Sequence, residues 1–191
     1  MPGSFAYCTS LAQSVKTNAN WLAIAGVARG LVSNIIPGSL NTKELLTNTI
    51  ADSYQKDTDV SINAITNIRP YGLTIWGNRT LKKNTVDEGT SATSFLNLRN
   101  LVNDVKKIAY TAAKSLMFEQ NTDILWINFK SKLTPTLDRM TSGQGLSGYK
   151  IIKETTSDRT KVKAKIILYP VYAVEKFEIT VIIRNEDIEV A

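Results

Sequence analysis

Apolar residues recur at helical spacing through two long segments in the middle of the chain. Between residues 94 and 117 they form one stripe, made of Leu98, Leu101, Val102, Val105, Ile108, Ala109, Ala112 and Leu116. This spacing is typical of an amphipathic helix. A second helix is predicted from about residue 122 to 140, with Asp123 in its first turn, where the helix dipole favours an anion. Pro135 lies inside it, so we expect a kink or a division there.

Shorter elements precede these two helices. Proline at position 70 cannot continue a hydrogen-bonded ladder, so it separates two strands instead of lying within one. The predicted elements are helices over 9–18 and 42–55, a buried strand or loop over 21–32, strands over 62–68 and 72–76, and a loop over 81–93.

The hydrophobic period changes from 3.6 to 2 after the flexible connection predicted at 141–148. Strands are predicted over 149–154, 161–169 and 176–184. In the last strand the apolar side chains on one face are Phe177, Ile179, Val181 and Ile183, and those on the other face include Lys176, Glu178, Thr180 and Arg184. The expected fold is therefore α/β (α+β), a mixed sheet packed by two long helices and ending in a β-rich segment. We divide the chain into a core, 1–175, and a C-terminal strand or arm, 176–191.

The final strand has two interpretations. It is either an ordinary last strand of its own domain or a strand donated to the sheet of a neighbouring subunit, because an exposed strand at a terminus aggregates unless it is paired.

The composition argues against catalysis. The 191 residues include no histidine and a single cysteine, Cys8, which excludes Ser-His and Cys-His nucleophile pairs and most zinc sites. Carboxylate pairs such as Asp57 and Asp59 lie in polar surroundings that would not raise a pKa for acid catalysis. No enzyme activity, cofactor or metal is predicted. The longest apolar run, 21–28, is far shorter than the roughly 20 residues of a membrane-spanning helix, so no membrane insertion is expected.

The positive charge is concentrated in one region. The chain carries a formal net charge of +6, and residues 130–165 hold nine basic and three acidic side chains. Residues 175–191 hold five acidic and two basic ones. A basic segment followed by an acidic one suits self-association or an oppositely charged partner. An alternative to such a protein partner is nucleic acid, bound by a module that uses the basic 150–165 region. However, no aromatic side chains alternate with Lys161, Lys163 and Lys165 to stack on bases.

Two short motifs have structural interpretations. Gly143, Gly145 and Gly148 match the G-x-G-x-x-G pattern of dinucleotide sites, but such a site needs a strand before the glycines and a helix after them. The predicted order here is the reverse, which favours a turn. The sequence Asn78-Arg79-Thr80 is a formal glycosylation sequon and is expected to be a polar turn.

Six segments together resemble the C-terminal region of contractile tail sheath proteins. They are WLAIAGVARGLV (21–32), YGLTIWGNRTL (71–81), SFLNLRNLVNDVKK (94–107), MFEQNTDILW (117–126), SGQGLSGYKI (142–151) and YPVYAVEKFEITV (169–181). Such proteins form the sheaths of phage tails, R-type bacteriocins and type VI secretion systems. Members of this family normally have more residues before the segment that corresponds to 21–32. We therefore expect this chain to be a fragment of a longer protein or a separately encoded part.

The resemblance implies a structural subunit that assembles as six-fold rings in a helical lattice around an inner tail tube and contracts to drive the tube through the target envelope. Implied partners are other copies of the chain, the inner tube protein, and baseplate and tail terminator proteins, with no direct contact to nucleic acid. The implied location is a virion tail assembled in the host cytoplasm. The resemblance does not distinguish between the sheath of a phage tail, of a bacteriocin and of a secretion system, or between the extended and contracted states of a sheath.

The resemblance also assigns roles to particular residues. The inter-subunit arm would contain Lys176, Phe177, Ile179, Val181 and Ile183. The strand that receives a neighbour's arm would contain Val162, Ala164, Ile166 and Leu168. A tube-facing surface is expected on the long helix at Arg99, Lys106 and Lys107.

Overall fold

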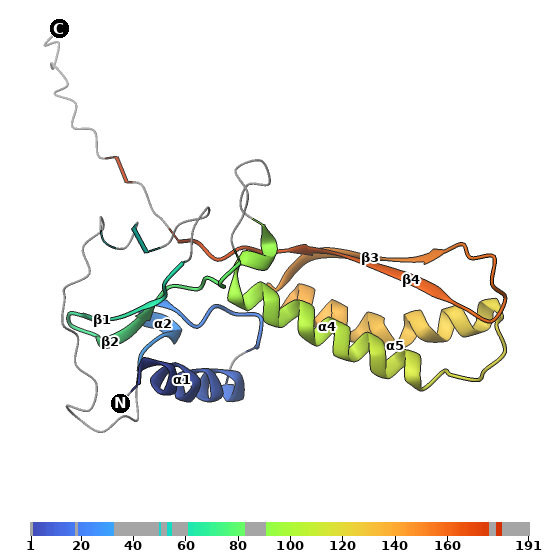
Figure 1. Cartoon of the computed structure of the whole chain (residues 1–191), viewed down its shortest axis with the longest axis horizontal. Helices are drawn as coiled ribbons and strands as arrows, with labels where there is room; N and C mark the ends of the chain where they lie inside the picture. The colour runs from blue at the N-terminus through green and yellow to red at the C-terminus, as the bar shows by residue number, and fades with distance from the viewer. Residues whose placement is uncertain are drawn as a thin grey trace, which may run out of the picture.

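The computed structural model describes residues 2–17, 19–32, 50, 53–54, 61–82, 91–175 and 179–180. Its elements divide between two ends of an elongated molecule (Figure 1). One end holds two short helices and a small hairpin, and the other holds two long helices covered by a second, longer hairpin.

The smaller end is built from α1 (Gly3–Thr17), α2 (Gly26–Arg29), β1 (Ala64–Ile68) and β2 (Gly72–Trp76). The two strands pair antiparallel, with Ile65 opposite Ile75. Residue Leu31 bridges to Thr74 on the other side of β2, where Ile75 N donates to Gly30 O at 2.7 Å. The side chain of Ile75 is 1% exposed, so this hairpin has an apolar centre of its own.

The two long helices are α4 (Leu96–Lys114) and α5 (Asp123–Ser142), with a short 3-10 turn, Ala92–Ser94, before α4. They lie side by side and run in opposite directions (Figure 1). The Thr122 hydroxyl caps α5 by accepting a hydrogen bond from Leu125 N, which satisfies an otherwise unpaired N–H of the first turn. α5 continues through Pro135 as one helix.

The longer hairpin consists of β3 (Leu146–Glu154) and β4 (Lys163–Pro170), paired antiparallel with Tyr149 opposite Leu168 and Ile151 opposite Ile166. The expected flexible connection at 141–148 is therefore shorter than predicted, because α5 extends to Ser142 and β3 begins at Leu146. Both ends of that connection are held, since Gly143 N donates to Arg139 O at 2.9 Å and Gly145 N donates to Met140 O at 2.8 Å.

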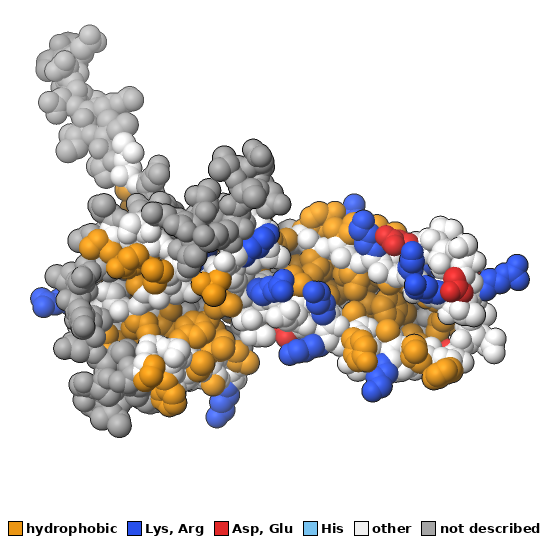
Figure 2. Space-filling view, in the orientation of Figure 1, with side chains coloured by type: hydrophobic (Ala, Val, Ile, Leu, Met, Phe, Trp, Pro, Cys, Tyr) orange, Lys and Arg blue, Asp and Glu red, His pale blue; other side chains and the backbone are white. Residues whose placement is uncertain are grey.

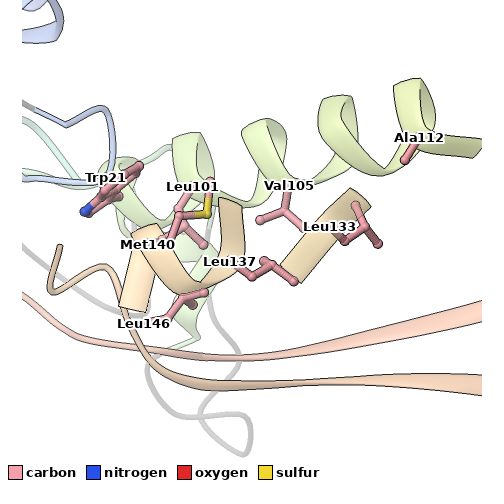
Figure 3. Packing of buried hydrophobic residues seen from close by; sticks show 8 residues of the cluster. All are labelled: Trp21, Leu101, Val105, Ala112, Leu133, Leu137, Met140 and Leu146. Atoms are coloured by element: carbon pink, nitrogen blue, oxygen red, sulfur yellow. The ribbon is translucent and has the colours of Figure 1, made fainter. Parts of the chain in front are cut away.

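The core joins the long helices to the start of β3. Its buried members are Trp21, Leu101, Val105, Ala112, Leu133, Leu137, Met140 and Leu146, and Figure 3 shows them between α4, α5 and the strands. Tyr149, Ile151, Ile166 and Leu168 pack against this cluster from the hairpin. One face of β3–β4 therefore covers the helices.

The predicted α/β class is confirmed, with the described strands divided between two small antiparallel sheets. Two local predictions need correction. α1 begins at Gly3 and not at residue 9, because Ala6, Ser10 and Ser14 share a buried face. Of the strand and the loop left open for segment 21–32, the loop is closer, and it contains a single helical turn and an isolated bridge that were not predicted.

Most of the predicted helix over 42–55 and residues 83–90 of the predicted loop lie outside the described residues. Within the part of the chain that the structure describes, no helix is both long and apolar enough to cross a bilayer.

Candidate functional site

The β3–β4 hairpin has two edges that no other described strand covers. A strand edge exposes unpaired backbone N–H and C=O groups, which are able to bind a further strand. The face opposite the helices carries both charged and apolar side chains, with Lys150 opposite Ile167, Ile152 opposite Lys165 and Glu154 opposite Lys163. The hairpin therefore offers a backbone edge that lies between a packed apolar face and a charged outer face.

The residues predicted to receive an arm lie along one face of this hairpin. Ile166 and Leu168 are half-buried against the core, whereas Ala164 and Val162, near the turn, are exposed. Val162 lies one residue before β4 begins at Lys163. Ala164, Ile166 and Leu168 therefore alternate along β4, Val162 lies just outside it, and the role of the four residues in receiving an arm stays a prediction.

The predicted arm residues are only partly described. Ile179 is 83% exposed, and neither it nor Thr180 belongs to a strand. Lys176, Phe177, Val181 and Ile183 lie outside the described residues.

The segment that connects β4 to the tail is held by one ion pair and one aromatic contact. Arg79 donates to both carboxylate oxygens of Glu175, from Nε at 3.0 Å and from Nη2 at 2.6 Å. The Arg79 guanidinium also lies 4.4 Å from the centre of the Phe95 ring. Phe95 in turn meets the ring of Tyr172 edge-on, with the ring centres 5.3 Å apart. We call these four residues the tail anchor.

The tail anchor combines several favourable contacts in a largely dehydrated place. The Arg79 side chain is 8% exposed and that of Glu175 is 21% exposed. A bidentate, charge-assisted pair is stronger than a single neutral hydrogen bond, and the cation over Phe95 adds a further attraction. Residues 171–175 are therefore fixed to the body of the protein at the point where the tail departs.

Sequence reasoning missed this anchor because it interpreted residues 78–80 as a polar turn. Asn78 is buried and its amide donates to Asn97 Oδ1 at 2.7 Å, and Asn97 donates to Trp21 O at 3.0 Å. The sequon asparagine is therefore part of an internal hydrogen-bond network. The sequence offered one signal, which is that Arg79 follows the predicted strand 72–76 by three residues.

A basic hollow lies at the turn between β3 and β4. It has a volume of about 500 Å³, and the charged side chains of its lining are the basic Arg159, Lys161, Lys163 and Lys153 and the acidic Asp158 and Glu154. Lys153 pairs with Asp123 at 3.2 Å, and Asp158 accepts from Thr160 Oγ1 at 2.6 Å and Thr160 N at 2.9 Å. These hydrogen bonds lower the pKa of Asp158 below its ordinary value. We call this hollow the basic basin.

Three cations of the basic basin form no direct ion pair within the described residues 91–175: Arg159, Lys161 and Lys163. Lys163 has the carboxylate of Glu154 as its cross-strand neighbour, so Arg159 and Lys161 are the more available cations. Figure 2 shows Lys and Arg side chains interspersed with Asp and Glu side chains at this end of the molecule, and other Lys and Arg side chains over its middle. The basin can therefore attract a group of carboxylates from another molecule.

The predicted tube-facing residues are all exposed on α4. Arg99, Lys106 and Lys107 each reach solvent, and Lys107 also lines a shallow hollow between α4 and α5 with Thr111 and Lys132. Their contact with a tube stays a prediction.

The glycine-rich motif serves packing. Trp21 Nε1 donates to Gly143 O at 2.8 Å, and a Cβ on Gly145 would lie 2.6 Å from Trp21 Cδ1 and 3.0 Å from Leu101 Cδ1. α5 ends just before Gly143 and β3 begins at Leu146, so Gly143 and Gly145 form the turn and Gly148 lies within the strand. In the described ranges, no group of three or more His, Cys, Asp or Glu side chains is positioned to hold a metal ion.

Two long antiparallel helices beneath an open-edged hairpin belong to a fold shared with a sheath complex of a contractile injection system. That structure is the contracted sheath of the extracellular contractile injection system PVC, matched at a TM-score of 0.68 and 23% identity over 94% of this chain and 49% of that chain. The baseplate of the anti-feeding prophage, solved with six-fold symmetry, contains a chain matched at a TM-score of 0.70 and 20% identity over 92% of this chain and 48% of that one.

A sequence relative points the same way. The tail sheath protein of Vibrio phage KVP40 is 22% identical over 177 residues, which cover 90% of this chain and 25% of that protein. No protein-family model matches the sequence. The resemblance to tail sheath proteins is confirmed, and the chain spans about a quarter to a half of the proteins it matches. Nothing in these matches supports the nucleic-acid-binding alternative.

Proposed function

We propose that this chain is part of a structural subunit of a contractile tail sheath and works by assembly, with no catalytic step. Copies would form six-fold rings stacked in a helical lattice around an inner tail tube, with contacts to baseplate and tail terminator proteins. The similarity to a phage tail sheath protein and to a contracted sheath complex supports this proposal. The assembled tail of a virion, built in the host cytoplasm, is the location that goes with it.

The observation that carries the proposal is the open-edged β3–β4 hairpin together with a tail that starts from a fixed point. A strand from a neighbouring copy would complete the hairpin by β-augmentation, in which backbone hydrogen bonds give affinity and alternate side chains give specificity. The alternating sequence at 176–184 supplies such a strand.

The energies suit a link that works through repetition. Pairing of the donated strand would form about five backbone hydrogen bonds at ~1 kcal/mol net each. Burial of four apolar side chains would add roughly 1.5–3 kcal/mol for each one, and the ordering of the tail and association would oppose much of this sum. One link is modest, but many links in a lattice hold the subunits together while their bodies move.

Deletion of residues 176–191 tests this function. The truncated protein should keep its far-ultraviolet circular dichroism and its urea midpoint, because every residue of the hydrophobic core cluster lies before the tail. Electron microscopy of negatively stained particles should show that striated cylinders are lost.

Substitutions within the tail provide the matched comparison. Ile179→Asp with Val181→Asp should also prevent assembly, whereas Glu178→Gln with Thr180→Ser, on the other face of the strand, should not. Normal cylinders from the deletion variant would show that the tail is not the link between subunits.

A further inference from the structure

We propose that the basic basin binds the acidic end of a neighbouring copy's tail, and that this contact sets the direction and register of the donated strand along β4. This inference rests on the proposed function, because it assumes that the tail of one copy pairs with the hairpin of another. To the proposed function it adds a binding site for the acidic end of the tail, the residues at the centre of that site and the direction of the donated strand.

Charge decides the direction. The tail carries Glu186, Asp187 and Glu189 just after its alternating segment. Arg159, Lys161 and Lys163 line the basic basin at the turn end of the hairpin, whereas Lys150 and Lys165 lie singly in its middle. At the opposite end of β4, residues 169–174 contain no basic side chain. A tail whose acidic end lies at the turn is therefore favoured over one that runs the other way.

Strand geometry then selects the partner edge. β4 runs from the turn toward the body of the protein, from Lys163 to Pro170. A tail with its acidic end at the turn runs antiparallel to β4 and parallel to β3. Antiparallel pairing is slightly more stable for each residue, so the free edge of β4 is the preferred site.

Side-chain alternation fixes the register. With Ile183 opposite Ala164, the tail places Val181 opposite Ile166 and Ile179 opposite Leu168, so that its apolar face continues the helix-facing side of β4. A shift by one residue would turn that apolar face outward. β4 begins at Lys163, so the same register brings Glu186 just past the start of the strand, next to Lys163 and to the turn residues Lys161 and Arg159 that line the basic basin.

The register contains one unfavourable contact. Arg184 would lie opposite Lys163, and like charges in directly opposite positions are destabilising. Glu186, two residues further along the same face of the tail, lies diagonally from Lys163 and offsets this repulsion. The net electrostatic interaction therefore favours this register only if the acidic residues of the tail contact the basic basin.

Disulfide cross-linking between separate chains tests the direction. Cys8 is an exposed free thiol, so every variant carries Cys8→Ser. Chains with Asn185→Cys are assembled with an equal amount of chains that carry Val162→Cys or Val171→Cys. These two valines are matched, since they flank β4 at its two ends and are 41% and 40% exposed.

The expected result is a disulfide-linked dimer with Val162→Cys and little with Val171→Cys. Mixing separate chains excludes a tail that folds back on its own hairpin, because only a link between chains gives the dimer. A stronger link to Val171→Cys, or no link to either in particles that assemble normally, overturns the proposal.

Charge reversal tests the basin. Lys161→Glu and Glu186→Lys should each raise the lowest protein concentration that gives ordered cylinders by about tenfold, equivalent to ~1.4 kcal/mol. The double variant should assemble at a concentration close to that of the parent protein. Lys150→Glu, in the middle of β3, is the matched control and should have little effect.

The outcomes separate this inference from the proposed function. If deletion of 176–191 leaves assembly intact, the proposed function fails. If the deletion prevents assembly but the two reversed charges do not rescue each other, only the basin contact is wrong. If Lys161→Glu leaves the cross-link intact and instead reduces binding to the tube, the basin binds the tube and the proposal is overturned.

Discussion

At the scale of single residues, the indole of Trp21 explains a motif that would otherwise suggest a nucleotide site. Gly143 accepts its N–H through a backbone carbonyl, and Gly145 lies against the face of the ring. Trp21 is 8% exposed and belongs to the main core cluster. The two glycines are therefore required by the space that one aromatic side chain occupies between α5 and β3.

Gly145→Ala should destabilise the protein by roughly 1–3 kcal/mol, because the new methyl group overlaps Trp21 and Leu101 in a packed core. The free energy of unfolding in urea measures this effect. Gly148→Ala is the control, since a Cβ there would lie 3.8 Å from Tyr169. Equal stability of the two variants would contradict the packing role of Gly145.

A second residue-scale prediction concerns pH. The Tyr149 hydroxyl donates to Asp138 Oδ1 at 2.6 Å. This hydrogen bond, with partial burial and the nearby carboxylate charge, raises the pKa of Tyr149 above its ordinary 10.0. A raised folded-state pKa stabilises the fold below the unfolded value, and this contribution is lost as pH rises through the folded-state pKa.

Tyr149→Phe should therefore be less stable than the parent at neutral pH, and the difference should shrink at about pH 11. Urea unfolding at the two pH values measures it. Lysine titration affects both proteins alike, so the difference between them isolates the tyrosine. A difference that does not change with pH would show that the hydrogen bond does not favour the neutral ring.

At the scale of elements, the tail anchor joins parts of the chain that lie far apart in sequence. Arg79 follows β2, Phe95 precedes α4, and Tyr172 and Glu175 follow β4. The contact therefore ties the smaller end of the molecule to the segment that leaves the longer hairpin.

A double-mutant cycle with Arg79→Ala and Glu175→Ala should give a coupling energy of roughly 0.5–3 kcal/mol. Hydrogen exchange should show lower protection at 171–175 in both single variants, with β4 protected as before. Arg79→Lys is the informative control, because a lysine keeps the charge but cannot make the bidentate contact. Additive effects of the two substitutions would mean that the pair does not anchor the tail.

Much at the element scale was predictable, and the failures have physical causes. The long amphipathic helix and the β3–β4 strands were placed to within a few residues, because their alternation reflects burial on one side. The helical turn within segment 21–32 was not predicted, since Gly26 adopts a positive φ of 75° and begins that turn within an apolar run. The tail anchor depends on contacts between distant residues, which no local pattern encodes.

At the scale of the whole molecule, the described body places its charged surfaces on different elements. The basic basin lies at the turn of β3–β4, whereas Arg99, Lys106 and Lys107 lie on α4. This separation allows the proposed contacts, to neighbouring copies at the basic basin and to a tube at α4, to be tested by separate substitutions.

Lys106→Glu with Lys107→Glu should weaken binding to an inner tube about 3- to 10-fold and leave contacts between sheath copies intact, because exposed charge pairs contribute modestly and are screened by salt. Co-sedimentation with tubes at low and moderate salt measures the change. Lys130→Glu, an exposed position on α5, serves as the comparison. Equal effects of the two changes would remove α4 as the tube-facing surface.

The position of the tail anchor determines how the protein responds to mechanical load. A pull on the residues beyond 175 reaches the Arg79–Glu175 pair and the Tyr172 ring before it reaches the backbone hydrogen bonds of β4. Those bonds would otherwise open one after another, as a strand peels from its end. The force is instead transmitted into α4 and β2 through Phe95 and Arg79, so the hairpin is protected from unzipping until the anchor gives way.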